Sequence, residues 1–166
     1  METERLRLRQ FRQDDLEAYA AILANPDVAR FFGDGLPAGR EDAWRHMAML
    51  VGHWDLLGFG RWCVELRSTG ACIGRVGLWR PEGWPGIELG WVIDPAHWGH
   101  GYAVEAGREG LRHGFGALRL PRIISLVAPH NHNSRRVAEK LGGEVEREMP
   151  FHGQTVLVYR FSTPWP

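Results

Sequence analysis

The chain has 166 residues, of which 44% are apolar and 24% carry a charge. This length corresponds to about one domain, so we expect residues 1–166 to form a single domain with a buried core, which excludes a disordered chain. The 20 basic and 20 acidic side chains cancel, which argues against nucleic acid as the main partner. A local basic pocket for a small polyanion stays compatible with this balance.

Neither a membrane span nor a secretion signal is expected. The longest stretch without a charged side chain, residues 123–134, covers 12 positions, whereas a membrane helix needs roughly 20 apolar residues. The N-terminal segment Met1–Arg5 is charged and has no apolar signal core. We therefore expect a cytoplasmic protein without contact to a membrane.

Cysteine and histidine spacing indicates neither a disulfide framework nor a metal. Cys63 and Cys72 lie in apolar segments on either side of a predicted turn, which favours buried, reduced thiols. The closest histidine pairs, His97-x-x-His100 and His130-x-His132, lack a helical His-Glu-x-x-His arrangement and a cysteine partner at zinc spacing. We therefore predict no metal site.

The first third of the chain predicts one strand followed by helices. Residues 6–11 alternate apolar and polar side chains, which indicates a half-buried strand. Asp14 with Glu17 three positions later indicates a helix start, and Asn25-Pro26 indicates a short second helix capped by the asparagine. A loop over 33–39 and a long helix over 41–57 follow. The residues placed on these helices are Leu16, Tyr19, Ala20, Leu23, Val28, Phe31, Phe32, Trp44, Met47, Met49, Leu50 and Trp54.

The rest of the chain alternates between strands and helices. A hairpin is predicted around the turn Ser68-Thr69-Gly70, and Asp94-Pro95 ends the strand that follows it. A parallel crossover through a helix joins that strand to the next one, whereas the remaining pairs are antiparallel. The predicted elements in chain order are strands at 62–67, 71–78 and 87–93, a helix at 102–118, a strand at 122–127, a helix at 133–141 and strands at 143–148 and 155–161.

The glycine-rich loop Trp98–Ala103 lies between a predicted strand and a predicted helix, where free backbone N–H groups and the helix dipole favour an anion. Gly99 and Gly101 lack side chains, so a phosphate can approach the backbone. A dinucleotide-binding fingerprint fails because Val104 stands where glycine or alanine is required, and no Gly-Lys-Ser/Thr sequence exists for a P-loop. For this loop taken alone, a turn without a ligand remains the alternative.

Two further segments, considered together with the loop, indicate a protein family. They are Glu88–Pro95 before the loop and Asn131–Gly142 after it. With them the chain resembles the GNAT superfamily of acyl-CoA-dependent N-acyltransferases, most closely the branch of Rim-type ribosomal-protein alanine N-acetyltransferases. The superfamily loop Arg/Gln-x-x-Gly-x-Gly/Ala aligns with Trp98–Ala103, where an aromatic first residue is typical of the Rim-type branch. The pattern Asn-x-x-Ser followed by Leu-Gly matches at Asn131, Ser134 and Leu141-Gly142.

The resemblance implies an α/β (α+β) fold with a mixed, mostly antiparallel seven-stranded sheet and helices on both faces. The fourth and fifth strands, here 87–93 and 122–127, splay apart, and the pantetheine arm of acetyl-CoA lies between them. Coenzyme A is then the product. The residues that the resemblance assigns to the cofactor are Trp91, Val92 and Ile93 by their backbone, the loop residues Trp98, Gly99, His100, Gly101, Tyr102 and Ala103 at the pyrophosphate, and Asn131 at pantetheine. Arg135 or, as our choice, Arg136 is assigned to an outer phosphate, with a solvated helix face as the alternative.

The implied reaction is direct attack of a primary amine on the thioester, for which the amine must be neutral. An α-amino group has a pKa of about 8 and a lysine amine one of about 10.4, so a protein N-terminus asks less of a general base. We predict Glu88 as this base, acting through water, and Ser134 as the acid for the leaving thiolate, because the resemblance implies a hydroxyl at this position. The tyrosine usual in this branch is absent from the helix, which leaves Ser134 or water as the acid. The alternatives are a structural glutamate and a helix-capping serine.

The acceptor itself stays open. The resemblance places an acceptor groove at Trp84 and the helices over 26–57, and most tryptophans are expected in the core or on the sheet. A protein N-terminus, a small molecule such as an aminoglycoside, polyamine or amino acid, and a catalytically silent acyl-CoA-binding module are the competing interpretations. The many aromatic side chains are compatible with a homodimer. The charged residues of the expected groove do not decide between a cationic small molecule and the other acceptors, because both signs are present. The acidic residues are Asp34, Glu41, Asp42, Asp55 and Glu82, and the basic residues are Arg30, Arg40 and Arg45.

Overall fold

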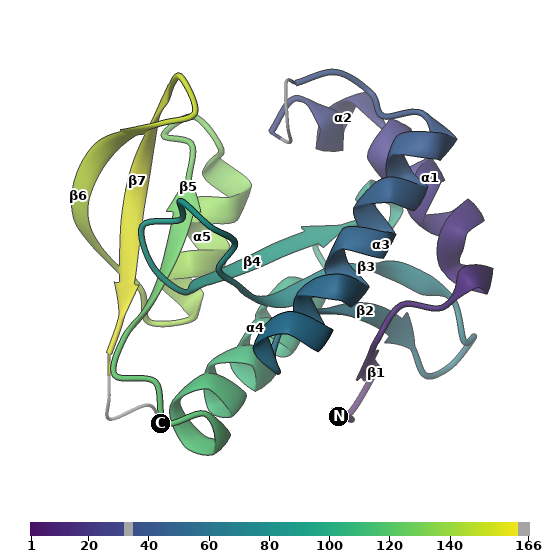
Figure 1. Ribbon diagram of the computed structural model, residues 1–166, viewed down its shortest axis with the longest axis horizontal. Coiled ribbons are helices and arrows are strands. Elements are labelled where there is room, and N and C mark those ends of the chain that lie inside the picture. The colour runs from purple at the N-terminus through teal and green to yellow at the C-terminus, as the bar shows by residue number, and fades with distance from the viewer. Residues whose placement is uncertain (32–34, 163–166) are drawn as a thin grey trace.

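A computed structural model describes residues 1–31 and 35–162 of the chain. These residues form a seven-stranded sheet in the order β1-β2-β3-β4-β5-β7-β6 (Figure 1). The pair β4–β5 is parallel and the other pairs are antiparallel, which confirms the predicted mixed sheet with one crossover. The strands are β1 (Leu6–Arg9), β2 (Arg61–Leu66), β3 (Cys72–Trp79), β4 (Glu88–Ile93), β5 (Ile123–Val127), β6 (Glu144–Phe151) and β7 (Gln154–Phe161).

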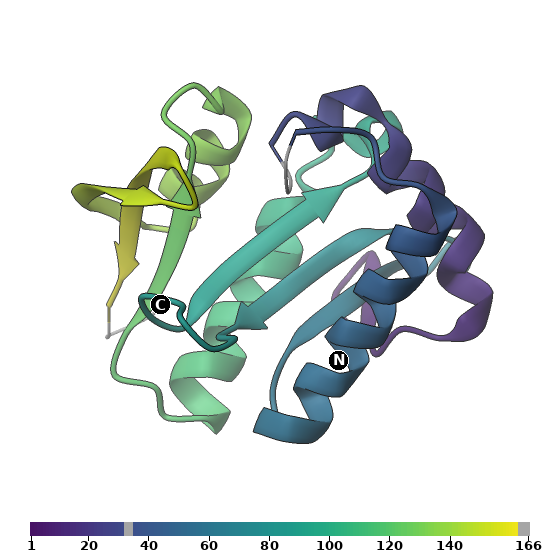
Figure 2. The ribbon, with the colours of Figure 1, turned by 45° about the horizontal axis from the view of Figure 1, so that its top comes forward.

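Helices cover both faces of the sheet, as the resemblance implies (Figure 2). Side chains of alternate strand residues point to opposite faces of the sheet. Trp62 and Val64 pack in the core beneath α4, whereas Cys63 and Trp79 pack beneath α1 and α3. In α4, Gly110 lets the helix approach β4 closely, because a Cβ there would lie 2.6 Å from a Leu89 methyl group. The helices are α1 (Leu16–Ala24), α2 (Pro26–Ala29), α3 (Arg40–Leu57), α4 (Tyr102–Arg112) and α5 (His132–Lys140). None of the described helices is both long and apolar enough to cross a membrane.

The observed helices differ from the predicted ones in two places. Asp14 does not begin a helix: a 3-10 turn spans Gln13–Asp15, and α1 starts after it because the Asp15 carboxylate accepts the backbone N–H of Arg12 at 2.7 Å. The helix after the glycine-rich loop changes to a π-helical turn at His113–Ala117. Asn25 caps α2 as predicted. Of the predicted second helix and loop, Phe32, Gly33 and Asp34 lie outside the described residues.

The tryptophans are divided between core and surface. Trp62 and Trp79 are buried, as expected for most of the tryptophans, whereas Trp44 on α3 is 50% exposed. The buried side of α3 carries Ala43, Met47 and Leu50, spaced by four and three residues, and Trp44 falls outside this stripe. The two cysteines are free and buried, as predicted.

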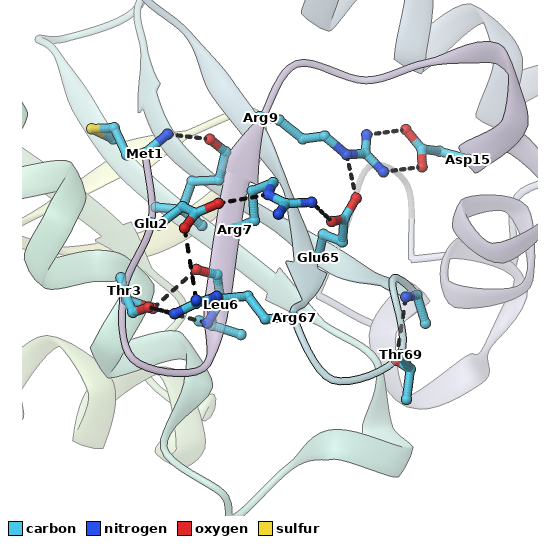
Figure 3. Close-up of polar contacts among 12 residues, drawn as sticks. Met1, Glu2, Thr3, Leu6, Arg7, Arg9, Asp15, Glu65, Arg67 and Thr69 are labelled. Carbon is cyan, nitrogen blue, oxygen red and sulfur yellow. Dashed lines mark hydrogen bonds and ion pairs between the residues drawn. The ribbon is translucent and has the colours of Figure 1, made fainter.

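A network of ion pairs joins β1 to β2 and to the turn before α1 (Figure 3). The Arg9 guanidinium donates to both carboxylate oxygens of Asp15 at 2.7 Å and, through Nε, to Glu65 at 2.6 Å. Arg7 reaches the other oxygen of Glu65 at 2.8 Å from the solvent side. Arg9 therefore compensates two buried carboxylates, whereas Arg7 is an exposed partner.

Removing Arg9 is expected to destabilise the protein far more than removing Arg7. Arg9→Ala leaves buried charge uncompensated, which costs about 3 kcal/mol of unfolding free energy, whereas Arg7→Ala costs less than about 1 kcal/mol. Urea denaturation at neutral pH measures both. The Arg9 hydrogen bonds lower the pKa of Glu65 and, against burial, that of Asp15. The Arg9 contribution is therefore present above the unfolded carboxyl pKa of about 4 and is lost as the pH falls through the lowered values. Equal losses for the two variants would contradict this assignment.

Candidate active site

A cavity of about 1070 Å³ opens where β4 and β5 separate. The two strands pair at a single position, Glu88 opposite Ile124, and the next link across the gap is the Ser125 hydroxyl, which donates to the Leu89 carbonyl at 2.5 Å. Beyond that point the strands diverge toward the N-termini of α4 and α5 (Figure 2). The predicted splay of the fourth and fifth strands is therefore confirmed.

The backbone of β4 alternates between the cavity and β3. The Val92 carbonyl faces β3, since a Cβ on Gly74 would lie only 2.1 Å from that oxygen. The neighbouring residues Trp91 and Ile93 therefore turn their backbone groups toward the gap. The Ile93 carbonyl already accepts the indole N–H of Trp98 at 2.7 Å. Of the three residues assigned to pantetheine by their backbone, Trp91 and Ile93 fit that role, whereas Val92 offers only its side chain.

The glycine-rich loop presents its backbone at the start of α4. Gly99 and Gly101 have φ angles of +80° and +82°, which favour glycine, and Gly101 is the N-cap of α4. The first N–H groups of the helix lack partners within it, so they and the helix dipole provide an anion site.

Arg5 adds a positive charge beside this loop. Its Nη1 donates to the His100 carbonyl at 3.0 Å, its Nη2 lies 2.6 Å from the Glu105 carboxylate, and the guanidinium sits 4.6 Å from the centre of the Tyr102 ring. Sequence reasoning missed Arg5 because it lies near the N-terminus, far along the chain from the loop.

The side chains at the start of α5 have distinct roles. The Asn131 side-chain oxygen accepts the backbone N–H of Ser134 at 3.1 Å, so Asn131, and not Ser134, caps the helix. The half-buried Ser134 lines the cavity with its hydroxyl uncommitted among the described contacts. Arg136 also lines the cavity, whereas Arg135 turns to the Tyr159 hydroxyl at 3.3 Å.

The structure brings nearly all of the predicted site residues to this one cavity. The exception is His100, whose exposed ring stacks on Tyr102 and contacts the Trp98 carbonyl with Nδ1 at 2.9 Å. Its backbone remains part of the loop. The predicted residues that line the cavity are Trp84, Glu88, Trp91, Val92, Ile93, Trp98, Gly99, Gly101, Tyr102, Ala103, Asn131, Ser134 and Arg136.

Glu88 is buried at the junction of β4 with the cavity and is 8% exposed. Its Oε2 accepts hydrogen bonds from Arg61 Nη2 and from the indole N–H of Trp84, both at 2.9 Å. Trp84 packs edge-on against Phe151 of β6 with 4.9 Å between ring centres. No hydrogen bond to the other oxygen, Oε1, is found among the described residues, so this atom can take a proton from a bound molecule.

Two buried arginines, which sequence reasoning missed, extend the site onto β2 and β3. Arg61 and Arg75 are 7% and 3% exposed and line the same cavity. Burial first, and then the charge of Arg75, lower the pKa of Arg61 to about 9, which leaves it a cation at neutral pH. Arg75 interrupts the apolar strand β3, and a charged residue inside such a strand is a sequence signal that could have identified it, whereas Arg61 is the first residue of β2 and gives no such signal.

Comparison with known proteins gives the family. Residues 5–144 match the family model for the acetyltransferase (GNAT) domain. The chain belongs to the GNAT acetyltransferase family. It is 33% identical over 147 residues to the uncharacterized N-acetyltransferase YoaA of Bacillus subtilis, covering 88% of this chain and 83% of that one.

Solved GNAT structures share the fold. An acetyltransferase from Agrobacterium tumefaciens matches with a TM-score of 0.87 and 34% identity, covering 98% of this chain and 94% of that one. A Mycobacterium smegmatis RimJ in complex with CoA-disulfide matches with a TM-score of 0.79 at 21% identity, covering 95% of this chain and 82% of that one. The Rim-type likeness therefore holds for the fold.

As a GNAT protein, the chain is an acetyl-CoA-dependent N-acetyltransferase. The site fits this cofactor on three counts: the strands part to admit an extended arm, a glycine-rich helix N-terminus suits a pyrophosphate, and Arg5 and Arg136 supply cations near it.

A neutral histidine on α3 lines the cavity of this GNAT protein. His46 Nδ1 lies 2.9 Å from the Tyr19 hydroxyl. Burial, and then the charges of Arg75 and Arg61, lower the pKa of His46 to about 2, and burial raises the pKa of Tyr19 to about 12. Both groups are uncharged at neutral pH.

His46 is expected to make folding sensitive to mild acid. The unfolded histidine has a pKa of about 6.5. Below this pH His46 is therefore protonated in the unfolded chain and stays neutral in the folded protein. At about pH 5 this lowers the unfolding free energy by at most about 2 kcal/mol relative to about pH 7.5. Urea titrations of the wild type and His46→Gln at both pH values test it, and the variant should lose less stability on acidification. An equal loss would show that His46 does not titrate in this way.

The described residues of this GNAT protein contain one group of potential metal ligands away from the cavity. The ligand atoms of Asp15, Cys63 and Cys72 lie within 4.8 Å of one another and are buried. However, both oxygens of Asp15 already accept from the Arg9 guanidinium at 2.7 Å. The carboxylate is therefore compensated within the chain, and we assign no metal there.

Proposed function

We propose that this N-acetyltransferase transfers the acetyl group to a primary amine by direct attack, without an acyl-enzyme step. The observation that carries the proposal is the position of Glu88, a buried carboxylate in the cavity that also holds the glycine-rich helix N-terminus. Bound acetyl-CoA supplies an activated thioester carbonyl. The protein has to hold it, neutralise the amine and protonate the departing sulfur.

Glu88 is the proposed general base. Arg61 and Trp84 fix its Oε2, which leaves Oε1 for the acceptor ammonium or an intervening water. Deprotonating an α-amine at neutral pH opposes a pKa of about 8, whereas a lysine side chain opposes one of about 10.4, a difference of roughly 3 kcal/mol. An α-amine therefore places the smaller demand on this carboxylate.

Ser134 is the proposed acid for the leaving thiolate. Asn131 caps α5, so the Ser134 hydroxyl is not needed for capping and faces the cavity. Its position in the first turn also exposes it to the positive end of the helix dipole, which favours a developing anion nearby.

The cofactor contacts that we propose follow the geometry of the cavity. The backbone N–H groups of Gly99–Ala103 and the Arg5 guanidinium hold the pyrophosphate. Trp91 and Ile93 pair with pantetheine through their backbone, and the Asn131 amide adds a hydrogen bond. Arg136 meets an outer phosphate from the exposed face of α5.

Two acceptor classes fit a primary amine. A protein N-terminal α-amine is consistent with the fold likeness to RimJ. A small-molecule amine is the second candidate, and the cavity of about 1070 Å³ has room for one beside Glu88.

Amine-dependent release of free CoA tests the function. Purified protein is titrated with acetyl-CoA, CoA and NAD by calorimetry, and thiol release is then followed with a panel of peptides and small amines. We expect binding of both CoA species, no binding of NAD and release that depends on the amine. Tight CoA binding without release by any amine would identify a silent binding module and overturn the proposal.

A further inference from the structure

The proposed base Glu88 is held in part by a loop outside the sheet. Two donors fix its Oε2 at 2.9 Å each, Arg61 Nη2 and the indole N–H of Trp84. Arg61 is the first residue of β2 and is 7% exposed, so the sheet itself holds this donor. Trp84 instead belongs to the loop between β3 and β4, so its indole needs contacts with other elements to keep its orientation.

An aromatic contact from a distant part of the chain meets the Trp84 ring. Phe151, the last residue of β6, packs edge-on against it, with 4.9 Å between the ring centres and an interplanar angle of 83°. This geometry is favourable, because the positive edge of one ring meets the negative face of the other. The exposed His152 ring lies farther away, at 5.5 Å between the centres. Trp84 also packs against the core beneath α1 and α3, so this core and Phe151 together hold the indole.

The β6–β7 hairpin fixes the position of Phe151. The two strands pair in antiparallel register up to Phe151 opposite Gln154. The residues that connect them, His152 and Gly153, have φ angles of +47° and +77°. A type I′ turn requires positive φ at both central residues, and such a turn sets the register of a two-residue hairpin. The backbone of the hairpin therefore determines where the Phe151 ring lies.

These contacts form a continuous path from the hairpin to Glu88. Arg61, Trp84, Glu88 and Phe151 all line the same cavity. Without the Phe151 ring the indole could turn away, and Oε2 would keep only the Arg61 donor. The Glu88 carboxylate could then rotate, so that Oε1 would no longer face a bound amine in one orientation. Such a change matters for the rate, because misplacing a catalytic group by about 1 Å can slow a reaction about 100-fold.

We propose that Phe151 is a positioning residue for acetyl transfer, which holds the Trp84 indole so that its N–H fixes the Glu88 carboxylate. This inference rests on the proposed function, in which Glu88 is the base. Because Phe151 acts through Trp84, removing its ring should affect turnover only while the indole N–H is present. The β6–β7 hairpin is thereby coupled to the base on β4.

A double-mutant cycle measures whether Phe151 acts through Trp84, with the best acceptor from the amine panel. Trp84→Phe keeps a ring but removes the N–H that donates to Glu88, and Phe151→Leu removes the edge that contacts the indole. Each change alone should lower kcat about 10-fold, and the double variant should lie within about twofold of Trp84→Phe. An unchanged kcat for Phe151→Leu, or effects that multiply to about 100-fold in the double variant, would overturn the proposal.

The Michaelis constant and two further variants separate positioning from a loss of structure. In Phe151→Leu, KM for acetyl-CoA should stay within about twofold, because the proposed cofactor contacts lie elsewhere on the cavity wall. Phe151→Tyr keeps the ring and should keep kcat within about twofold of the wild type. The control Val145→Ala shortens a 50% exposed side chain near the other end of β6 and should leave kcat unchanged. Equal losses of kcat in Val145→Ala and Phe151→Leu would contradict the proposal.

NMR of the indole N–H keeps this inference distinct from the function. In CoA-saturated protein with isotope-labelled tryptophan, the Trp84 signal is identified by its absence from Trp84→Phe. Phe151→Leu should speed exchange of this N–H with solvent about 10-fold or more, whereas Phe151→Tyr should not. Unchanged exchange in Phe151→Leu would overturn the positioning role and leave Glu88 as the base. Faster exchange, with full turnover in both Phe151→Leu and Glu88→Gln, would overturn the base and with it the role of Phe151 in the reaction.

Discussion

Gly101→Val is expected to raise the dissociation constant for CoA about 100-fold or more. Gly101 has a φ of +82° at the N-cap of α4, where valine is strained, and its side chain would cover the N–H groups that we propose to bind the pyrophosphate. Losing two charge-assisted hydrogen bonds of about 1.5–3 kcal/mol each accounts for an effect of this size. Calorimetric titration with CoA measures it.

Gly70→Val is the matched control for backbone strain. Gly70 has a φ of +73° and no atom within 4 Å of an added Cβ, whereas an added Cβ at Gly101 would meet Arg5 Nη2 at an ordinary contact distance of 3.7 Å; Gly70 lies in the turn between β2 and β3. This variant should share the loss of stability and keep the CoA affinity within about twofold. If both variants bind CoA equally well, the loop does not hold the pyrophosphate.

Glu88→Gln is expected to lower kcat/KM for acetyl transfer by about 100-fold to 10,000-fold, the range for loss of a general base. Glutamine has the size of glutamate and keeps a carbonyl that can accept from Trp84, so the shape of the cavity is retained. The affinity for CoA should stay unchanged, because the contacts that we propose for the pyrophosphate and pantetheine lie elsewhere on the cavity wall. Steady-state kinetics and calorimetry together measure both quantities.

Glu82→Gln is the control for general electrostatics, since Glu82 is an exposed carboxylate at the same cavity. Its turnover should stay within about twofold of the wild type. The thermal midpoint of Glu88→Gln is measured alongside, because this change also leaves the buried Arg61 without its partner. A folded Glu88→Gln variant with nearly full turnover would exclude Glu88 as the base.

Much of the fold could be predicted from local patterns. The strand alternation at Leu6–Arg9 and the Asn25-Pro26 cap appear where expected, because each depends on neighbouring residues. Asp14 was misread because it lies inside the 3-10 turn Gln13–Asp15, which precedes α1. Trp44 lies on the predicted helix, but its exposed position could not be predicted, because composition does not say which side of an amphipathic helix faces the core.

The candidate site also has one part that the sequence could predict and another that it could not. The glycine loop and the Asn131–Ser134 segment form continuous motifs, so sequence could place them together once the family resemblance was noticed. Arg5, Arg61 and Arg75 belong to no motif, and their importance depends on strand register and on packing between segments far apart in the chain. The backbone alternation that turns Val92 away from the gap also requires the pairing with β3.

The single pairing between β4 and β5 has a consequence for handling the protein without its cofactor. A sheet that parts in its middle presents two interior strand edges, and such edges invite pairing with strands from other molecules. In the cell, a pool of acetyl-CoA would keep these edges covered. A preparation stripped of the cofactor therefore carries an aggregation hazard that originates in the same gap that admits the substrate.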